Sequence, residues 1–201
     1  FFAALASSAS SPPNKTVVSS TKASSSTWSE DLTAAAAAAE LPAAAGGGLK
    51  RSLEVLHLPS CNMTPNSSVE LSKMEALREL DLSSCRNDTA YISHATDFLE
   101  RLGEDEDAPL RQSLQVLNVS RVPPAAPALA LGVFARFKNL RVLDLSHCEL
   151  STTSVERLQE LLPASLQWLS LAWNPHVTDA SIKSISEVLL NMEFLDVCGC
   201  G

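Results

Sequence analysis

A nine-residue motif recurs six times along this chain, and its period constrains the fold more than any other feature. The motif has an apolar residue at position one, Leu at position four, an apolar residue at position six and usually Cys at position nine. It occupies residues 53–61, 77–85, 114–122, 140–148, 166–174 and 192–200. Successive motifs begin 24, 37, 26, 26 and 26 residues apart. Such a period is typical of a stacked repeat array, which usually works by offering an extended concave surface.

The motif predicts a strand, and the segments between motifs predict helices. Apolar and polar residues alternate in Leu80-Asp81-Leu82 and Leu143-Asp144-Leu145, which is the period of a strand with one buried face. Thr178 and Asp179 are suitable residues to begin a helix. Two helical stripes follow from the apolar spacing: Val155, Leu158, Leu161 and Leu162, and then Ile182, Ile185, Val188 and Leu189. Stacked units of this kind give six parallel strands about 4.8 Å apart.

Two further helices are expected in the second and third units. The second unit's helix is predicted over residues 89–102, and Pro127 suits the first position of the third unit's helix. Seven residues of these two helices are predicted to face the core: Tyr91, Ala95, Phe98, Leu102, Leu131, Phe134 and Phe137.

The motif resembles the cysteine-containing class of leucine-rich repeats, most closely over Cys148–Leu169 and Asn174–Ile182. The resemblance covers about residues 49–201. It implies an α/β leucine-rich-repeat solenoid, a horseshoe with a parallel concave sheet and helices on the convex side. In that family this class is frequent in F-box/leucine-rich-repeat proteins, the substrate receptors of cullin-type ubiquitin ligases. The chain departs from the pattern in its 37-residue second unit and at Val122, which replaces Cys.

Composition divides the chain into three parts. Residues 1–28 are rich in Ser, Ala and Thr and are predicted to be disordered. Residues 29–48 predict a helix followed by a Gly-rich turn into the first strand, either as a degenerate repeat or as an alanine tract with no packing role. Residues 49–201 form the leucine-rich-repeat domain. Because the chain starts without Met and stops within a repeat, we interpret it as a fragment, truncated at its C-terminus.

The cysteines are predicted to be structural. Four of the five stand at position nine, namely Cys61, Cys85, Cys148 and Cys200, where a buried thiol can donate a weak hydrogen bond to a carbonyl. Asn174 stands at the same position with a stronger donor. One thiol per layer favours a reducing compartment, so we expect a cytoplasmic or nuclear protein. Five Asn-x-Ser/Thr triplets leave secretion open.

Several ligand classes are disfavoured. Cys198-Gly199-Cys200 has no second Cys or His cluster with zinc spacing, so we expect no metal and no cofactor. A net charge of −8 and a pI of about 5.0 disfavour binding to duplex DNA. The longest uncharged apolar run is too short to span a membrane. The acidic cluster Glu104–Asp107 is interpreted as a solvated loop, with docking of a basic partner as the alternative.

A protein-binding surface is predicted on the concave face, where positions three and five point outward. From the third motif onward position three is apolar and ends in two aromatic residues. The predicted contact residues are Val116, Val142, Trp168 and Phe194, with Trp173 at the rim and Arg121, His147 and Asp144 at the edge. The alternative is that these residues face further repeats or another part of the chain. The aspartates at position five are expected to be solvated, with recognition of a basic partner as the alternative.

No catalytic centre is expected. His147 and Cys148 are neighbours in sequence, but the repeat turns Cys148 into the core, and nothing supplies an oxyanion site beside Asp144 or Ser146. The resemblance implies a substrate-recognition module of a ubiquitin ligase, whose other subunits would bind outside this chain. A general intracellular scaffold, sensor or inhibitor is the alternative. Regulation of a small GTPase is a third class, for which the chain shows no signature Arg-bearing loop.

Overall fold

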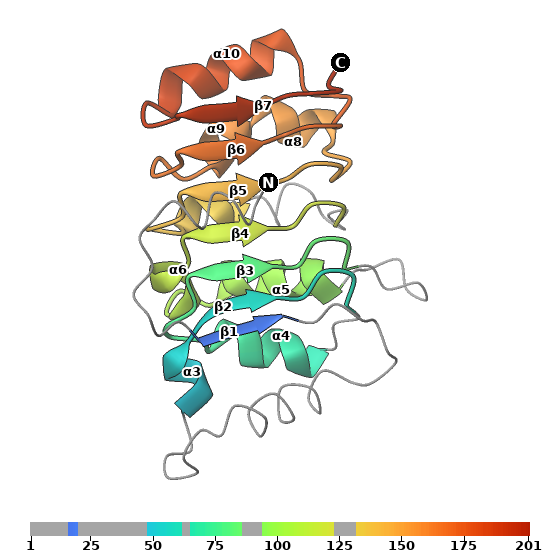
Figure 1. Ribbon diagram of the computed structural model, residues 1–201. Helices are drawn as coiled ribbons and strands as arrows, with labels where there is room; N and C mark the ends of the chain where they lie inside the picture. Colours follow the sequence, from blue (N-terminus) through green and yellow to red (C-terminus); the bar gives the residue numbers. More distant parts are fainter. Residues whose placement is uncertain (1–15, 20–47, 62–64, 86–93, 123–131) are drawn as a thin grey trace.

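The computed structural model of the chain describes residues 16–19, 48–61, 65–85, 94–122 and 132–201. Its strands form one open sheet in which neighbours are parallel and follow one another in chain order (Figure 1). They are β1 (Thr16–Ser19), β2 (Leu53–His57), β3 (Glu79–Asp81), β4 (Val116–Asn118), β5 (Val142–Asp144), β6 (Trp168–Ser170) and β7 (Phe194–Asp196). The six motifs therefore give six parallel strands, as predicted.

Strand β1 is the exception to the sequence prediction. Its four residues lie in the segment 1–28, which composition predicts to be disordered, yet they pair with β2. The other residues of that segment lie outside the described part of the chain. So do residues 29–47, where a helix was predicted. Of the expected Gly-rich turn, only Gly48 is described, and it begins a short helix, α3 (Gly48–Ser52), that leads into β2.

The register of the sheet aligns each motif position across all six motifs. The position-four residues lie side by side: Leu56, Leu80, Leu117, Leu143, Leu169 and Leu195. The same pairing places position three beside position three and position five beside position five. Each position therefore forms a column that crosses the strands.

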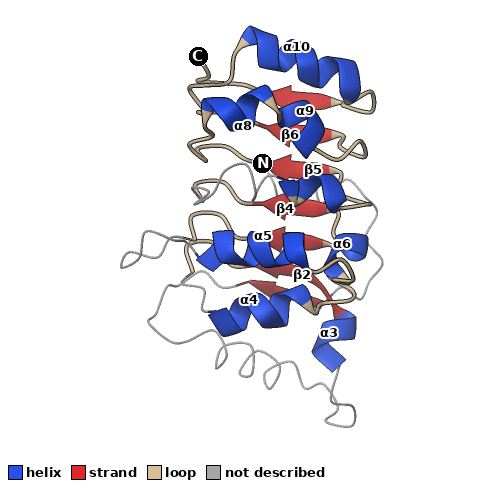
Figure 2. Cartoon of the chain, turned by 180° about the vertical axis from the view of Figure 1, so that it is seen from behind, coloured by secondary structure: helices blue, strands red, loops and turns tan. Residues whose placement is uncertain are grey.

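Helices cover one face of this sheet. The described helices are α3, α4 (Pro65–Ser72), α5 (His94–Glu104), α6 (Leu110–Ser113), the 3-10 helix η1 (Phe134–Arg136), α8 (Thr152–Glu156), α9 (Leu158–Leu161) and α10 (Asp179–Val188). The sheet lies in front in Figure 1, and α4, α5, α8, α9 and α10 lie in front of it when the molecule is seen from behind in Figure 2. This open α/β arrangement is compatible with a leucine-rich-repeat solenoid.

The hydrophobic core lies between the sheet and these helices. In the first five motifs, every residue at positions one, four and six is at most 2 % exposed. These residues join one cluster with helix residues such as Phe98, Phe134 and Phe137. Each fully buried side chain of this size contributes about 2 kcal/mol by removal of apolar surface from water. In the sixth motif Met192 and Leu195 are only partly buried and Val197 is exposed.

Most of the predicted core residues of the helices are buried where the structure describes them, although Ile182 is only partly buried. Ala95, Phe98, Leu102, Phe134 and Phe137 are all buried. The four residues of the first predicted stripe are buried as well, but they are divided between two short helices: Val155 lies in α8, Leu158 and Leu161 lie in α9, and Leu162 follows directly after α9. Val188 is exposed, because α10 is the last helix of the stack and no described element packs on its outer side. Residues 89–93, Pro127 and Leu131 lie outside the described residues.

Position nine connects each layer to the one before it. The thiols of Cys85, Cys148 and Cys200 donate to the position-six carbonyls of Leu58, Val119 and Leu171, at 3.1, 3.2 and 3.2 Å. The Asn174 amide donates in the same way to the Leu145 carbonyl, at 2.9 Å. These contacts confirm the structural role predicted for the cysteines.

The position-nine thiols of Cys85 and Cys148 have raised pKa values. Burial raises the pKa of Cys85 and the pKa of Cys148 to about 12, so both thiols stay protonated and able to donate at neutral pH. Val122 occupies position nine of the third motif and has no donor group. The link to the preceding layer is therefore missing at that one step.

A buried arginine caps the long helix of the enlarged second unit. The Arg111 guanidinium donates from Nε to the Leu102 carbonyl, at 2.7 Å, and from Nη2 to the Gly103 carbonyl, at 2.9 Å. These carbonyls lie at the C-terminal end of α5, where a cation also interacts favourably with the helix dipole. The acidic residues 104–107 that follow are all exposed. The longer unit is thus a helix with its own cap, followed by a solvated acidic turn.

Candidate functional site

The face of the sheet opposite the helices, here called the open face, carries positions three and five. Val55 and Trp168 stand at position three and are only 7 % and 8 % exposed, yet neither belongs to the core cluster. They are therefore buried on the other side of the sheet, as the alternation of the motif predicts. The position-three column runs Val55, Glu79, Val116, Val142, Trp168 and Phe194.

The apolar part of this column ends in an aromatic pair. The rings of Trp168 and Phe194 stack with centroids 5.4 Å apart and planes 5° from parallel. Val116 and Val142 continue the column and are partly exposed. Phe194 is 42 % exposed, but the predicted exposure of Trp168 is wrong. The reason is geometric: adjacent strands lie about 4.8 Å apart, so a large flat ring packs against the side chain on the next strand.

Glu79 interrupts the apolar column and has a partner that the sequence analysis missed. Its Oε1 lies 2.7 Å from Nε2 of His57, which stands at position five of the preceding strand. Glu79 is buried, and a buried carboxylate needs such a partner. The register alone could have revealed the pair, because positions three and five of adjacent strands are diagonal neighbours.

The position-five column has a structural role in the turn that ends each strand. Oδ1 of Asp81, Asn118, Asp144 and Asp196 accepts a hydrogen bond from the backbone N–H two residues later, at 2.8, 3.0, 2.9 and 3.0 Å. The expectation that the aspartates are simply solvated is therefore incomplete. One oxygen fixes the turn, and the side chain remains half-buried on the open face.

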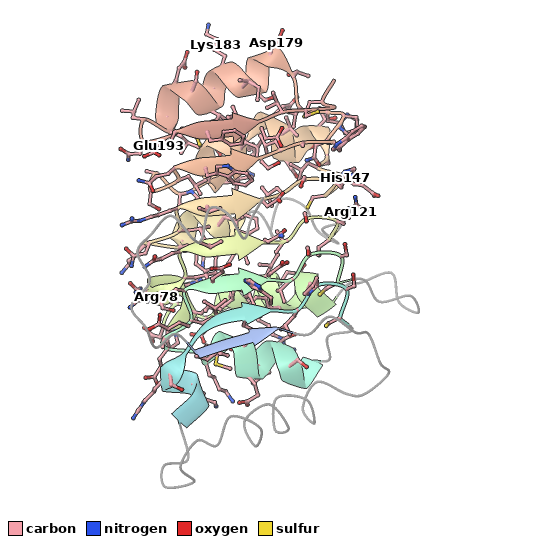
Figure 3. The ribbon with its side chains drawn as sticks, viewed as in Figure 1. Arg78, Arg121, His147, Asp179, Lys183 and Glu193 are labelled. Atoms are coloured by element: carbon pink, nitrogen blue, oxygen red, sulfur yellow. The ribbon has the colours of Figure 1, made fainter. Side chains whose placement is uncertain are left out.

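The rim of the open face is formed by position eight, where every described residue has a left-handed backbone. The φ angles are 58° for Ser60, 58° for Ser84, 60° for Arg121, 55° for His147, 60° for Trp173 and 70° for Gly199. Figure 3 shows Arg121 and His147 on the loops beyond the strand ends, whereas Arg78 and Glu193 lie where the strands begin. The predicted rim residues are thus on one side of the sheet.

Trp173 is the most exposed aromatic residue of the described rim. Its side chain is 56 % exposed, although its ring stacks on His147 with centroids 5.4 Å apart and planes 11° from parallel. On the Gly199 side the ring lies so close that a Cβ added to Gly199 would be 2.8 Å from ring atoms Cδ2 and Cε3. His147 and Gly199 therefore hold the indole in place while much of it faces solvent.

Asp144 lies between the apolar column and this aromatic rim. Burial raises the pKa of its carboxyl, the charges of Asp196 and Asp81 raise it further, and hydrogen bonds from Ser146 oppose the shift. Both the backbone N–H and the hydroxyl of Ser146 bond to Asp144 Oδ1. The hydroxyl is therefore engaged with Asp144, while the His147 ring stacks on Trp173. Among the described residues, no hydrogen bond links Ser146 or Cys148 to His147 in the manner of a nucleophile and its base.

The described part of the chain lacks two kinds of functional feature. Within those ranges, no three side chains of His, Cys, Asp or Glu are grouped so that they could hold a metal ion. No helix found there combines the length and the apolar character that crossing a membrane requires.

Comparison with known proteins gives one local match. A family model described as Leucine Rich Repeat matches residues 139–161, which contain the fourth motif, β5 and α8. No curated protein matches the chain. The match supports a leucine-rich repeat protein, and such repeats are generally non-catalytic, protein-binding modules.

Proposed function

We propose that this chain is a non-catalytic protein-binding module whose partner contacts the open face near its C-terminal strands. The contact surface comprises Val116, Val142, Trp168, Phe194, Trp173, Arg121, His147 and Asp144. We also propose that the sheet curves as in a horseshoe, so that this face is its concave wall. One observation carries the proposal: the exposed aromatic surface of Trp173 and Phe194 gathers beside an apolar column on the face that the described helices leave open.

The chemistry of this surface supports the proposal. Aromatic residues are enriched at interfaces because they bury a large area with little loss of side-chain entropy. The Trp173 ring is already held by His147 and Gly199, so little further ordering is needed on binding. Trp168 lies beneath Phe194 and acts as its support.

Affinity capture with matched variants tests the proposal. Trp173→Ala and Phe194→Ala are expected to weaken retention of a specific partner by about tenfold or more, which corresponds to about 1.4 kcal/mol each. Lys183→Ala is the control, because Lys183 is exposed on α10, away from the open face (Figure 3). If both aromatic variants retain the partner as the wild type does, the open face is not the binding surface.

The finer proposal is that the module recognises substrates for a cullin-type ubiquitin ligase. It is supported only by the resemblance of the motif to F-box/leucine-rich-repeat proteins. Co-purification of the full-length protein with ubiquitin-ligase subunits would support it, and their absence from a complex that still holds the partner would favour a scaffold, sensor or inhibitor. We further propose a cytoplasmic or nuclear location, which fluorescence microscopy of the tagged protein would test.

A further inference from the structure

The acidic side chains of the open face form a regular row. Asp81, Asp144 and Asp196 stand at position five on β3, β5 and β7, while the strands between them carry uncharged Asn118 and Ser170. Neighbouring parallel strands lie about 4.8 Å apart, so the carboxylates repeat about every 10 Å along the stack. We call these three residues the acidic row.

Within the described part of the chain, the acidic row has no cation of its own. None of its members forms an ion pair with a described residue, and the His57 imidazole in the same column is engaged by Glu79. All three are half-buried. Besides the effect of burial, repulsion from Asp196 and Asp81 acts on Asp144. A cationic ligand lying along the row would relieve this repulsion.

Apolar surface flanks the row near its C-terminal end. The position-three residues Val142, Trp168 and Phe194 lie on one side, and Trp173 lies on the rim at the other side. A segment lying along the row would place its charges in the middle and gain apolar contact at both edges. This arrangement favours a polypeptide over a small ion.

We propose that the open face binds an extended basic segment of another protein, which crosses the strands with Arg or Lys side chains on Asp81, Asp144 and Asp196. This inference rests on the proposed function and names its partner class. An extended polyproline II segment rises about 3.1 Å per residue, so every third side chain lies about 9 Å apart, close to the repeat of the row. An ionised carboxylate accepts several hydrogen bonds, so each aspartate can hold its turn and still bind a cation.

Synthetic peptides that each carry three arginines test the spacing. The first carries three arginines at every third position in a Pro/Ser/Gly background, and the second carries the same arginines side by side. A third is helical, with arginines seven residues apart, which is about 10.5 Å along a helix. Binding is measured by fluorescence anisotropy at physiological salt, where non-specific attraction is screened.

The first peptide is expected to bind at least about tenfold more tightly than the other two. Asp144→Asn and Asp196→Asn should each lower its affinity several-fold, whereas Asp179→Asn removes the same charge from α10 and should leave it unchanged. Circular dichroism confirms that each variant is folded. Equal binding of the two extended peptides, tighter binding of the helix, or insensitivity to Asp144→Asn would overturn the inference.

The two proposals fail in different ways. If none of the peptides binds but Trp173→Ala still abolishes capture of a partner, the open face binds protein and only the basic class is wrong. If capture is insensitive to Trp173 and Phe194 as well, the proposed function itself fails.

Discussion

The indole of Trp173 lies flat against the imidazole of His147, with ring centroids 5.4 Å apart. Both residues stand at position eight of successive motifs, and the next residue in that column is Gly199. Left-handed backbone does not by itself require this glycine, because Arg121 and His147 adopt the same conformation. The requirement comes from the Trp173 ring, which fills the space of a Cβ.

Gly199→Ala should therefore displace Trp173 rather than unfold the chain. The added methyl group would lie 2.8 Å from two ring atoms, so the indole must move away from its position beside His147. We expect a loss of about 1–2 kcal/mol in stability, because of the close contact and the left-handed backbone, and a clear change in tryptophan emission. Ser84→Ala is the control at the same motif position. Unchanged emission in a Gly199→Ala, Trp28→Phe, Trp168→Phe background would show that the ring contact is not maintained in solution.

Trp168 should contribute to stability as well as to binding. Its burial and its stacking on Phe194 predict that Trp168→Ala lowers the free energy of unfolding by about 2–3 kcal/mol, as loss of a large packed ring does. Trp168→Phe keeps a ring on the sheet and should recover more than half of this loss. Urea denaturation measures both variants. A Trp168→Ala protein as stable as the wild type would contradict the burial described here.

Substitution of the asparagine at position nine should cost more stability than substitution of a cysteine at that position. Asn174 is fully buried; it donates to the carbonyls of Leu145 and Leu171 and accepts from the Leu150 N–H. Asn174→Ala leaves these groups without their partner, so we expect a loss of about 3 kcal/mol. Asn174→Cys keeps the thiol donor that other motifs use, so its stability should lie between that of the wild type and that of Asn174→Ala. Thermal unfolding of the wild type, Asn174→Cys and Asn174→Ala gives their order of stability. Equal losses for the Ala and Cys variants would argue against a stabilising hydrogen bond from position nine to the preceding layer.

The thiols should differ sharply in reactivity. Cys198 is exposed, whereas Cys85 and Cys148 are buried, and burial raises the pKa of each of these two to about 12. Iodoacetamide at pH 8 should therefore modify Cys198 first and reach Cys85 and Cys148 only after unfolding, as mass spectrometry would show. Early labelling of Cys148 in the folded protein would show that its position-nine thiol is accessible to solvent and does not lie in the core.

The motif predicts the sheet well because its information is periodic and repeated. Six strands, their parallel order and the burial of position four all follow from one spacing. Strand β1 could not be found in this way: Thr16–Ser19 carries no motif, and it is stabilised by pairing with a strand far along the chain. The burial of Trp168 could not be predicted from its motif position either, because it depends on the Phe194 ring that stacks on it. The hydrogen bonds of the position-five aspartates were predictable in principle, since an acceptor two residues before a turn N–H is an ordinary turn signal.

The Asp144 carboxyl has two roles: it carries a charge, and its Oδ1 accepts the hydrogen bonds of the turn. The pH dependence of stability distinguishes the two roles. Because burial raises the pKa of its carboxyl, the folded state holds the proton more tightly than the unfolded state between the ordinary Asp pKa and the raised value. Stability is therefore lost as the pH rises through that interval, and the charged form is the less favourable one at pH 7. Asp144→Asn removes the charge but keeps the Oδ1 acceptor, as Asn118 does on the neighbouring strand. This variant should be at least as stable as the wild type at pH 7, and the difference should vanish below the ordinary Asp pKa. Asp144→Ala loses the acceptor as well as the charge, so it should be less stable than Asp144→Asn by about 1 kcal/mol at every pH. Thermal unfolding from pH 3 to pH 8 measures all three, and an Asp144→Asn protein clearly weaker than the wild type at pH 7 would mean that the carboxylate has a cationic partner in solution.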